Sequence, residues 1–508
     1  MLLGYYTLGS RAALTTYPSN RTSQFFFFGQ DDIRVNEKLT LNLGLRWEYY
    51  TPVTDAHNNQ ANFDLATGDI LLACIATSCS AGVNSDLRDW SPRVGFAYTP
   101  DRGKTALRGG FGISYFSPGY GGQLGTLNDA YPFIQGQGLT PANNITLNPA
   151  TDPILSQGLP GLPPTEERPG APPGHIIPKG SLGAGWFDPN LKMTRAYQWS
   201  LNLQRSITPN LLVDAAYVGN SVNNIFIGFA NNYPEPGQNL TDPATGRPLS
   251  LQERRPYYSV DPELVTFGMG FNAGVSHYHA LQLKIEKRFS GGLQFLTSYT
   301  VSKVLQRGVN HTNPDNYMVD KAPASFDVPQ RLVVSYSYEL PFGRKKHFGQ
   351  SWNSITNGVL GNWQVSGITT YMSGFPFQPS ITSTLDNGNS NVPNRTTCSG
   401  KISDPTIDRW FDPGCFVAPP VNVIGNMGYG ILRGPGFRNW DFSLMKNFPW
   451  TESRFVQFRA EFFNLPNNVN FALPNASLCG GGCGEGTITA LAAGTHARQI
   501  QFGLKIYF

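Results

Sequence analysis

The end of the chain carries the pattern that most narrows its fold. From residue 500 onward every second side chain is large and apolar, and the positions between them hold Gln501, Gly503, Lys505 and Tyr507. Successive side chains of a β-strand point to opposite faces, so a period of two produces one apolar and one polar face. The apolar row, which ends on an aromatic residue, consists of Ile500, Phe502, Leu504, Ile506 and Phe508. This strand needs an apolar medium on one side and a polar one on the other.

The same alternation recurs along the whole sequence and predicts about thirteen strands. Most run for about 9–14 residues, which is enough to cross a bilayer when the strand is tilted. Strands of soluble sheets average about 5–6 residues. The segments that carry the pattern are 25–35, 39–49, 93–98, 107–115, 197–203, 211–217, 281–285, 293–301, 332–340, 363–371, 440–444, 456–462 and 500–508.

The composition indicates a β-barrel of the bacterial outer membrane. Only 14% of the 508 residues are charged, against about 25% in soluble proteins. Aromatic residues reach 13%, yet no run of about 18 apolar residues exists, which excludes a helical membrane protein. Apolar residues spread over alternating strands fit an antiparallel transmembrane barrel. The formal net charge of +4 is too small to indicate nucleic acid as a partner.

The connections between the predicted strands alternate between short and long. Short turns lie near residues 35–38, 100–104, 207–210, 290–292 and 449–452, and between them come long polar loops at 53–90, 118–194, 221–275, 305–328, 375–435 and 467–496. Outer-membrane barrels have short periplasmic turns and long outer loops. One connection, from Pro341 to Leu360, is unusually long for the periplasmic side.

Charged residues on the polar faces of the strands predict a charge network in the lumen. We expect it to include Arg46, Glu48, Arg108, Asp441, Arg459 and Glu461. A hairpin turn centred at residue 450 would place Asp441 opposite Arg459, within reach of a salt bridge. The chain has no Ser/His/Asp, Gly-x-Ser-x-Gly or His-Glu-x-x-His arrangement, so we expect no enzyme activity, catalytic residue or cofactor.

Six cysteines form three local pairs in the predicted outer loops. We expect disulfides between Cys74 and Cys79, between Cys398 and Cys415, and between Cys479 and Cys483. The alternative, a metal site, is weaker because each pair offers only two thiols. His277 and His279 share one strand face, but that face continues into Leu281 and Leu283. We therefore assign them to an aromatic rim at the membrane surface rather than to a metal.

Several segments, in this order, resemble the C-terminal barrel of TonB-dependent receptors of the Oar-like group. They are QDDIRV (30–35), LTLNLGLRWEY (39–49), PRVGFA (92–97), YELPFG (338–343) and RAEFFN (459–464). The resemblance spans nearly the whole chain. It implies a 22-stranded barrel, an N-terminal plug and a TonB box, so residues 1–508 would be the C-terminal part of the barrel. The expected partners are outer-membrane lipid, an unknown ligand and, through the missing N-terminal part, the TonB energy-coupling complex.

Strand direction and the chain ends lead to the same expectation of missing segments. If the last strand ends in the periplasm, the first of thirteen strands also runs from outside to inside, so an odd number of strands is missing. A barrel of 22 would lack nine, together with the plug and TonB box, and no signal peptide is visible at Met1. The resemblance also implies recognition of the terminal strand by the barrel assembly machinery through Phe502, Leu504, Ile506 and Phe508.

Three functions are compatible with these patterns. The first is a TonB-dependent transporter or receptor, the second a passive porin, and the third an adhesin or structural barrel that acts through its long loops. A plug and TonB box encoded upstream would select the first, and a signal peptide directly before Met1 the second. Loss of surface attachment without loss of uptake, after deletion of residues 118–194, would select the third.

Overall fold

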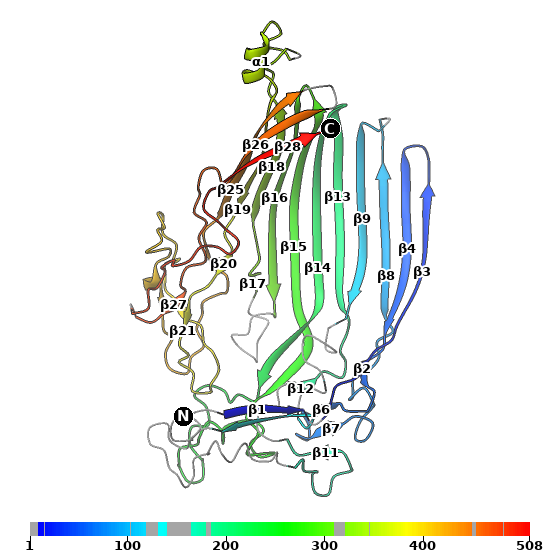
Figure 1. Cartoon of the computed structure of the whole chain (residues 1–508). Helices are drawn as coiled ribbons and strands as arrows, with labels where there is room; N and C mark the ends of the chain where they lie inside the picture. The colour runs from blue at the N-terminus through cyan, green and yellow to red at the C-terminus, as the bar shows by residue number, and fades with distance from the viewer. Residues whose placement is uncertain are drawn as a thin grey trace.

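A large antiparallel sheet dominates the computed structural model (Figure 1). The structure describes residues 9–14, 16–101, 103–117, 127, 131–139, 164–178, 184–308, 321–344, 346–449, 454–480 and 482–508. Among these residues no helix is long and apolar enough to cross a membrane.

The main path of this sheet contains the thirteen strands that the sequence predicts, and along this path each strand pairs with the path strands directly before and after it in the chain. They are β3 (Gln24–Arg34), β4 (Leu39–Tyr50), β8 (Asp89–Tyr98), β9 (Thr105–Phe116), β13 (Thr194–Thr208), β14 (Leu211–Asn231), β15 (Phe267–Ser290), β16 (Leu293–Arg307), β18 (Gln330–Glu339), β19 (Trp363–Met372), β25 (Phe437–Pro449), β26 (Phe455–Phe463) and β28 (Gln499–Tyr507). The sheet is open, with β3 and β28 at its two edges. Both edge strands run toward the end of the molecule that carries the C-terminus (Figure 1).

The alternating apolar residues form an exposed outer face. In β28, Phe502 and Leu504 are 68% and 70% exposed, and Leu283 and Leu201 lie in the equivalent row of β15 and β13. An exposed apolar row on one face of every spanning strand is what a lipid-facing surface requires. Aromatic side chains gather near the loop end of this face, where Trp47 stacks against Phe27 and Tyr49.

Two strands extend far into a segment that the sequence predicts to be a loop. The sequence indicates a loop over residues 221–275, but β14 continues to Asn231 and β15 begins at Phe267. Short β12 (Ala184–Phe187) pairs with β15 in parallel. The reason for the extension is packing outside the bilayer: Phe226 stacks on Phe187, and Phe267 is fully buried against Phe63. Beyond the membrane the strands become part of a loop domain with its own core.

The long loops pack into buried clusters at one end of the sheet. One cluster contains Phe187, and a second contains Phe63 and Phe267. A third is built around Phe411, Phe416 and Leu432. The loops contain short elements: β1 (Gly9–Leu14), β2 (Asn20–Arg21), β5 (Thr54–Asp55), β6 (Ala61–Phe63), β7 (Ile70–Leu72), β10 (Ile134–Leu139), β11 (His175–Ile176), β17 (Ala322–Pro323), β20 (Pro376–Phe377), β21 (Ser380–Ile381), β22 (Asn394–Arg395), the 3-10 helix η3 (Pro413–Cys415), β23 (Phe416–Val417), β24 (Leu432–Arg433) and β27 (Ser477–Leu478).

The three disulfides join Cys74 to Cys79, Cys398 to Cys415 and Cys479 to Cys483, as the sequence predicts. All three lie in the loop regions. Cys415 is buried in the cluster around Phe411, so the second bridge ties a loop to its own core.

The predicted pairing of Asp441 with Arg459 is wrong. Arg459 lies opposite Met445, because β25 continues through Pro449, which faces Phe455. This pairing moves the centre of the hairpin to position 452. The register that forms places Phe442 opposite Phe462, with ring centroids 6.2 Å apart. A cross-strand aromatic pair contributes about as much as an exposed ion pair, so the charges alone could not fix the register.

The other end of the sheet carries short turns and one longer segment. This segment connects β18 to β19 and contains the only α-helix among the described residues, α1 (Ser354–Leu360). Figure 1 shows α1 beyond the ends of the strands, on the side away from the large loops. The sequence indicates an unusually long connection here, but it does not predict the helix.

Candidate functional site

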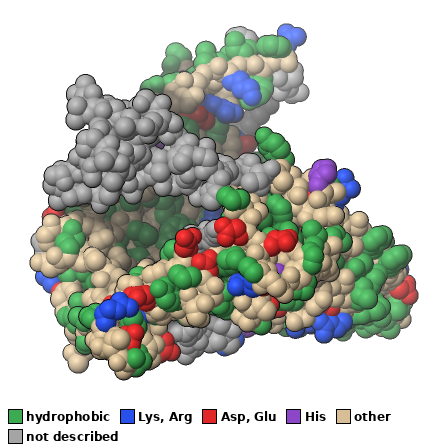
Figure 2. All heavy atoms as spheres, turned by 90° about the horizontal axis from the view of Figure 1, so that it is seen from below, with side chains coloured by type: hydrophobic (Ala, Val, Ile, Leu, Met, Phe, Trp, Pro, Cys, Tyr) green, Lys and Arg blue, Asp and Glu red, His purple; other side chains and the backbone are tan. Residues whose placement is uncertain are grey.

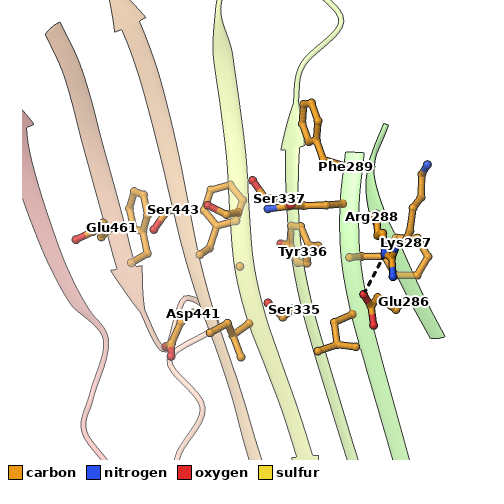
Figure 3. A pocket seen from close by; sticks show the side chains of 18 of the residues that line it. Glu286, Lys287, Arg288, Phe289, Ser335, Tyr336, Ser337, Asp441, Ser443 and Glu461 are labelled. Carbon is orange, nitrogen blue, oxygen red and sulfur yellow. Dashed lines mark ion pairs between the residues drawn. The ribbon is translucent and has the colours of Figure 1, made fainter. Parts of the chain in front are cut away.

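The concave inner face of the sheet holds a cavity of about 800 Å³. It extends across β15, β16, β18, β19, β25 and β26, in the half of the sheet that lies toward the short turns. Figure 3 shows Glu286 and Arg288 at one side of the cavity and Asp441 and Glu461 at the other. A pocket that spans six neighbouring strands requires the sheet to curve around it, which identifies this side as the interior of the barrel.

The floor of the cavity is rich in hydroxyl groups. Ser335 and Ser337 of β18 lie next to Ser366 of β19 and Ser443 of β25. These residues occupy the polar positions of the alternating pattern, between apolar residues that face outward. The Ser337 hydroxyl accepts a hydrogen bond from the side-chain amide of Gln364 at 2.7 Å. The predicted lumen residues are all charged and do not include these serines, although their period of two is visible in the sequence.

Ion pairs line both sides of the cavity. At one side, the Lys284 Nζ lies 2.9 Å from Glu286, and the Nε of Arg288 lies 3.8 Å from the same carboxylate. At the other side, Arg459 lies 3.9 Å from Glu461 and donates a hydrogen bond to Gln457. The side chains of these ion pairs are partly exposed, so water, a ligand or a second polypeptide can reach them.

The six residues predicted as a lumen charge network lie in separate places. Arg46 and Glu48 form an ion pair on β4, 3.2 Å apart, and the buried Glu48 carboxylate also accepts hydrogen bonds from Ser91 and Tyr50. Arg108 donates to Gln204 between β9 and β13. Asp441 accepts a hydrogen bond from the backbone N–H of Asn464 at 2.8 Å.

Of the six, the structure therefore brings together Asp441, Arg459 and Glu461 on β25 and β26, with the ion pair between the latter two. Arg46, Glu48 and Arg108 lie toward the other edge of the sheet, and eight strands separate β4 from β25. Among the described residues the charges form local pairs rather than one network.

Ion pairs also hold the outer loops together. The fully buried Asp327 accepts hydrogen bonds from Arg433 and from the backbone N–H of Val304. Arg254 donates to Asp386 at 2.9 Å across two loops. Figure 2, which views the molecule from the loop side, shows acidic and basic side chains interspersed on the described surface.

The pKa of Asp386 reflects its role between the loops. Burial alone would raise this pKa, but hydrogen bonds from the Gly237 N–H and from the Arg254 guanidinium outweigh it and hold the pKa below its usual value. The carboxylate therefore stays ionised over the physiological range.

At two places where the sequence analysis weighs a metal site, the structure shows a disulfide and a hydrogen bond. The side chains of Cys479, Cys483 and Glu485 lie close together, but the two sulfur atoms form a disulfide and are not thiolate ligands. His279 shares a hydrogen bond with the Tyr217 hydroxyl at 2.7 Å and stacks on the Tyr217 ring. It lies on the outer face beside Trp199, as expected for an aromatic rim.

The open antiparallel meander, its exposed apolar outer face and its polar interior define an outer-membrane β-barrel. Residues 1–501 match the family described as the outer membrane beta barrel domain, and the chain belongs to that family. It is therefore a protein of the bacterial outer membrane. A search of curated protein sequences found no match.

Similar solved structures come from outer-membrane transporters. The transporter YddB of Escherichia coli is 12% identical, with a TM-score of 0.45 over 96% of this chain and 45% of that chain. The ferric-catecholate import receptor Fiu of E. coli K12 is 10% identical, with a TM-score of 0.42 and coverage of 96% and 45%. The FrpB iron transporter of Neisseria meningitidis is 11% identical, with a TM-score of 0.41 and the same coverage. This chain spans less than half the length of each.

Proposed function

We propose that the chain is the C-terminal part of the barrel of a TonB-dependent outer-membrane transporter or receptor, related to the Oar-like group, which takes up an unidentified ligand. The observation that carries this proposal is the polar inner cavity lined by Ser335, Ser337, Ser366 and Ser443 between two sets of partly exposed ion pairs. A wall of this kind suits contacts with a polar plug or ligand. The motif resemblance of the sequence points to the same class.

The open edges of the sheet support a second part of the proposal, that further strands of the barrel precede this chain. An unpaired strand edge in hydrocarbon costs several kcal/mol for each unsatisfied backbone group. The edges of β3 and β28 run in the same direction, so direct pairing between them would be parallel, unlike every other pair in the main path. An odd number of added strands, about nine for a 22-stranded barrel, would close the sheet with antiparallel pairs only.

Two measurements on the full natural protein test this function. A plugged receptor keeps its lumen closed, so the protein in planar bilayers should conduct KCl poorly, whereas a steady, large conductance would indicate a porin. Cells that express the protein should deplete a compound from a complex medium, detected by mass spectrometry, only when their TonB complex is intact. Depletion that is equal in cells without TonB would contradict the proposal.

The packed outer loops support a second candidate function, attachment to a surface or partner. Loops that only connect strands need neither a buried cluster nor a disulfide, and these loops have both. Deletion of residues 378–431 from the full protein separates the two functions. If the loops mediate attachment, the variant should lose attachment and keep its TonB-dependent depletion of the compound. Loss of depletion without loss of attachment would show that these loops serve transport instead.

A further inference from the structure

The segment between β18 and β19 has an apolar surface that the protein does not cover. Its helix α1 has no buried residue, and Ile355, Val359 and Leu360 are 79%, 60% and 51% exposed. The helix is nevertheless well formed, because the Asn353 side chain caps it by accepting a hydrogen bond from the Thr356 N–H at 2.7 Å. A short helix with this much exposed apolar surface normally packs against something.

Two side chains of the outer face hold the end of α1 in place. The indole N–H of Trp363 donates to the Val359 carbonyl at 2.9 Å, and the Lys446 ammonium donates to the Gly361 carbonyl. Trp363 and Lys446 are cross-strand partners on β19 and β25, and both occupy positions of the outward, apolar row. The helix is therefore tied to the lipid-facing side of the sheet.

The burial of Lys446 follows from this arrangement. Only 2% of this residue is exposed, although it lies on the outer face. Its ammonium is 5.5 Å from the ring centroid of Trp363 and 5.3 Å from that of Phe448. The Gly361 carbonyl lies at the negative end of the helix dipole, where a cation is favourable.

The rest of the segment continues the same surface. Phe342 and Phe348 pack together with ring centroids 5.8 Å apart and are both exposed. Residues 341–362 include Arg344, Lys345, Lys346 and His347 but no Asp or Glu. Lys346 pairs with Glu339 of β18, while the exposed Arg344 donates to the backbone and side chain of its own segment. The segment thus combines exposed apolar side chains with an excess of positive charge.

We propose that this segment is an interfacial anchor in the periplasmic leaflet of the outer membrane. Phe342, Phe348, Ile355, Val359 and Leu360 insert among the upper acyl chains, and the basic residues bind anionic phospholipid headgroups. Short turns of outer-membrane barrels face the periplasm, which places α1 at that leaflet. Apolar side chains beside basic ones bind anionic lipid surfaces in this way. Phospholipid is the occupant because the apolar patch is continuous with the lipid-facing row through Trp363 and Phe448.

A nitroxide label tests the depth of the helix in the full natural protein. We would attach it at Val359→Cys and, as a matched control, at Gly358→Cys, in vesicles of phosphatidylethanolamine and phosphatidylglycerol. All cysteines of the described residues are in disulfides, so within this part of the protein the new thiol is the one that reacts. A side chain at Gly358 has open space, and on the helix it is turned by about 100° from the side chain of Val359.

The anchor predicts that the label at residue 359 is several-fold more accessible to oxygen than to a water-soluble nickel complex, with the reverse order at residue 358. In vesicles of zwitterionic phosphatidylcholine alone, the label at residue 359 should become more accessible to nickel. Equal nickel accessibility at both positions would overturn the proposal, and equal immersion in both lipid mixtures would overturn the headgroup contact. Protection in cells without immersion in vesicles would assign the surface to a periplasmic protein instead and would also overturn it.

Discussion

At the scale of single residues, the outer face depends on large side chains that cover small ones. Gly219 lies opposite Trp199, and a Cβ at this glycine would lie 2.2 Å from the indole ring. The ring thus covers the glycine and reaches His279 on the next strand. An aromatic residue that shields a strand glycine compensates for the packing that the glycine lacks.

We expect Gly219→Ala to lower the stability of the folded barrel by about 1 kcal/mol, because the indole must move away from the added methyl group. The free energy of unfolding in detergent, followed by urea titration, measures this effect. Gly29→Ala is the control, because a Cβ at Gly29 meets no atom within 4 Å. If both substitutions have equal effects, the cover provided by Trp199 is irrelevant.

A second residue-scale prediction concerns the buried carboxylate of Asp327. Asp327→Asn should destabilise the loop region by about 1.5–3 kcal/mol, the range for hydrogen bonds to charged groups, because Arg433 loses its charged partner. Limited proteolysis of the loops measures the change. The double variant Asp327→Asn with Arg433→Met should recover part of the loss, and a fully additive result would argue against a direct coupling.

At the scale of elements, the loops behave as a small folded layer. Contacts between distant loops include Arg254 with Asp386 and the Asn387 side chain with the Pro234 carbonyl. The disulfide between Cys398 and Cys415 closes a loop of 17 residues around a buried cluster. In the chain-entropy account, a loop of this size contributes about 3 kcal/mol.

The depressed pKa of Asp386 predicts how the contact between these loops responds to acid. A carboxyl group whose folded pKa lies below its unfolded pKa contributes stability above the unfolded pKa, and this stability is lost as the pH falls through the folded pKa. The contact should therefore be constant from neutral pH down to about pH 4, the ordinary Asp range, and weaken below it. Hydrogen exchange of the Gly237 amide at several pH values measures this. In Asp386→Asn the amide should exchange faster at neutral pH and respond less to acid.

Replacement of Cys398 and Cys415 by serine should make residues 396–416 accessible to trypsin at Arg409 while the transmembrane sheet stays intact. The serines remove the bridge but leave the buried cluster around Phe411 in place. Peptide mapping after brief digestion gives the result. The matched control is the Cys479→Ser, Cys483→Ser variant, whose bridge lies in another loop. Similar cleavage at Arg409 in both variants would contradict a local role.

Element boundaries separate what the sequence predicts from what it does not. The thirteen spanning strands are predictable because lipid outside and water inside impose a strict period of two. The extension of β14 to Asn231 is not, because its side chains pack in a loop core formed by distant residues such as Phe187. The pairing of Arg459 with Met445 is not predictable either. The even or odd position of a residue, its parity, fixes the face to which its side chain points but not the length of the turn. Parity also places the serines of the cavity on the inner face, but uncharged serines are common on any polar face and do not mark a site.

At the scale of the whole molecule, the chain is a curved wall with one lipid face and one hydrated face. The terminal strand β28 completes the outer row, and Phe508 is 96% exposed. Deletion of Phe508 in the full natural protein should reduce the amount of folded barrel in the outer membrane several-fold, if the assembly machinery recognises this residue. The heat-dependent shift of the folded band in gel electrophoresis gives the amount. Leu201→Ala, which removes an exposed apolar side chain from β13, should have little effect, and wild-type levels after the deletion would refute the role.

The neighbour-only pairing of the main sheet also has a consequence for the folding rate. Because every strand pairs with the next one in the chain, each added strand closes a loop no longer than one connection, and loop-closure entropy grows only slowly with length. The pairs therefore have low contact order and can form one after another. In a closed barrel, a single seam must join β28 to a strand from the far end of the chain. That contact has the greatest sequence separation, so we expect seam closure at β28 to be the step that limits the rate of folding.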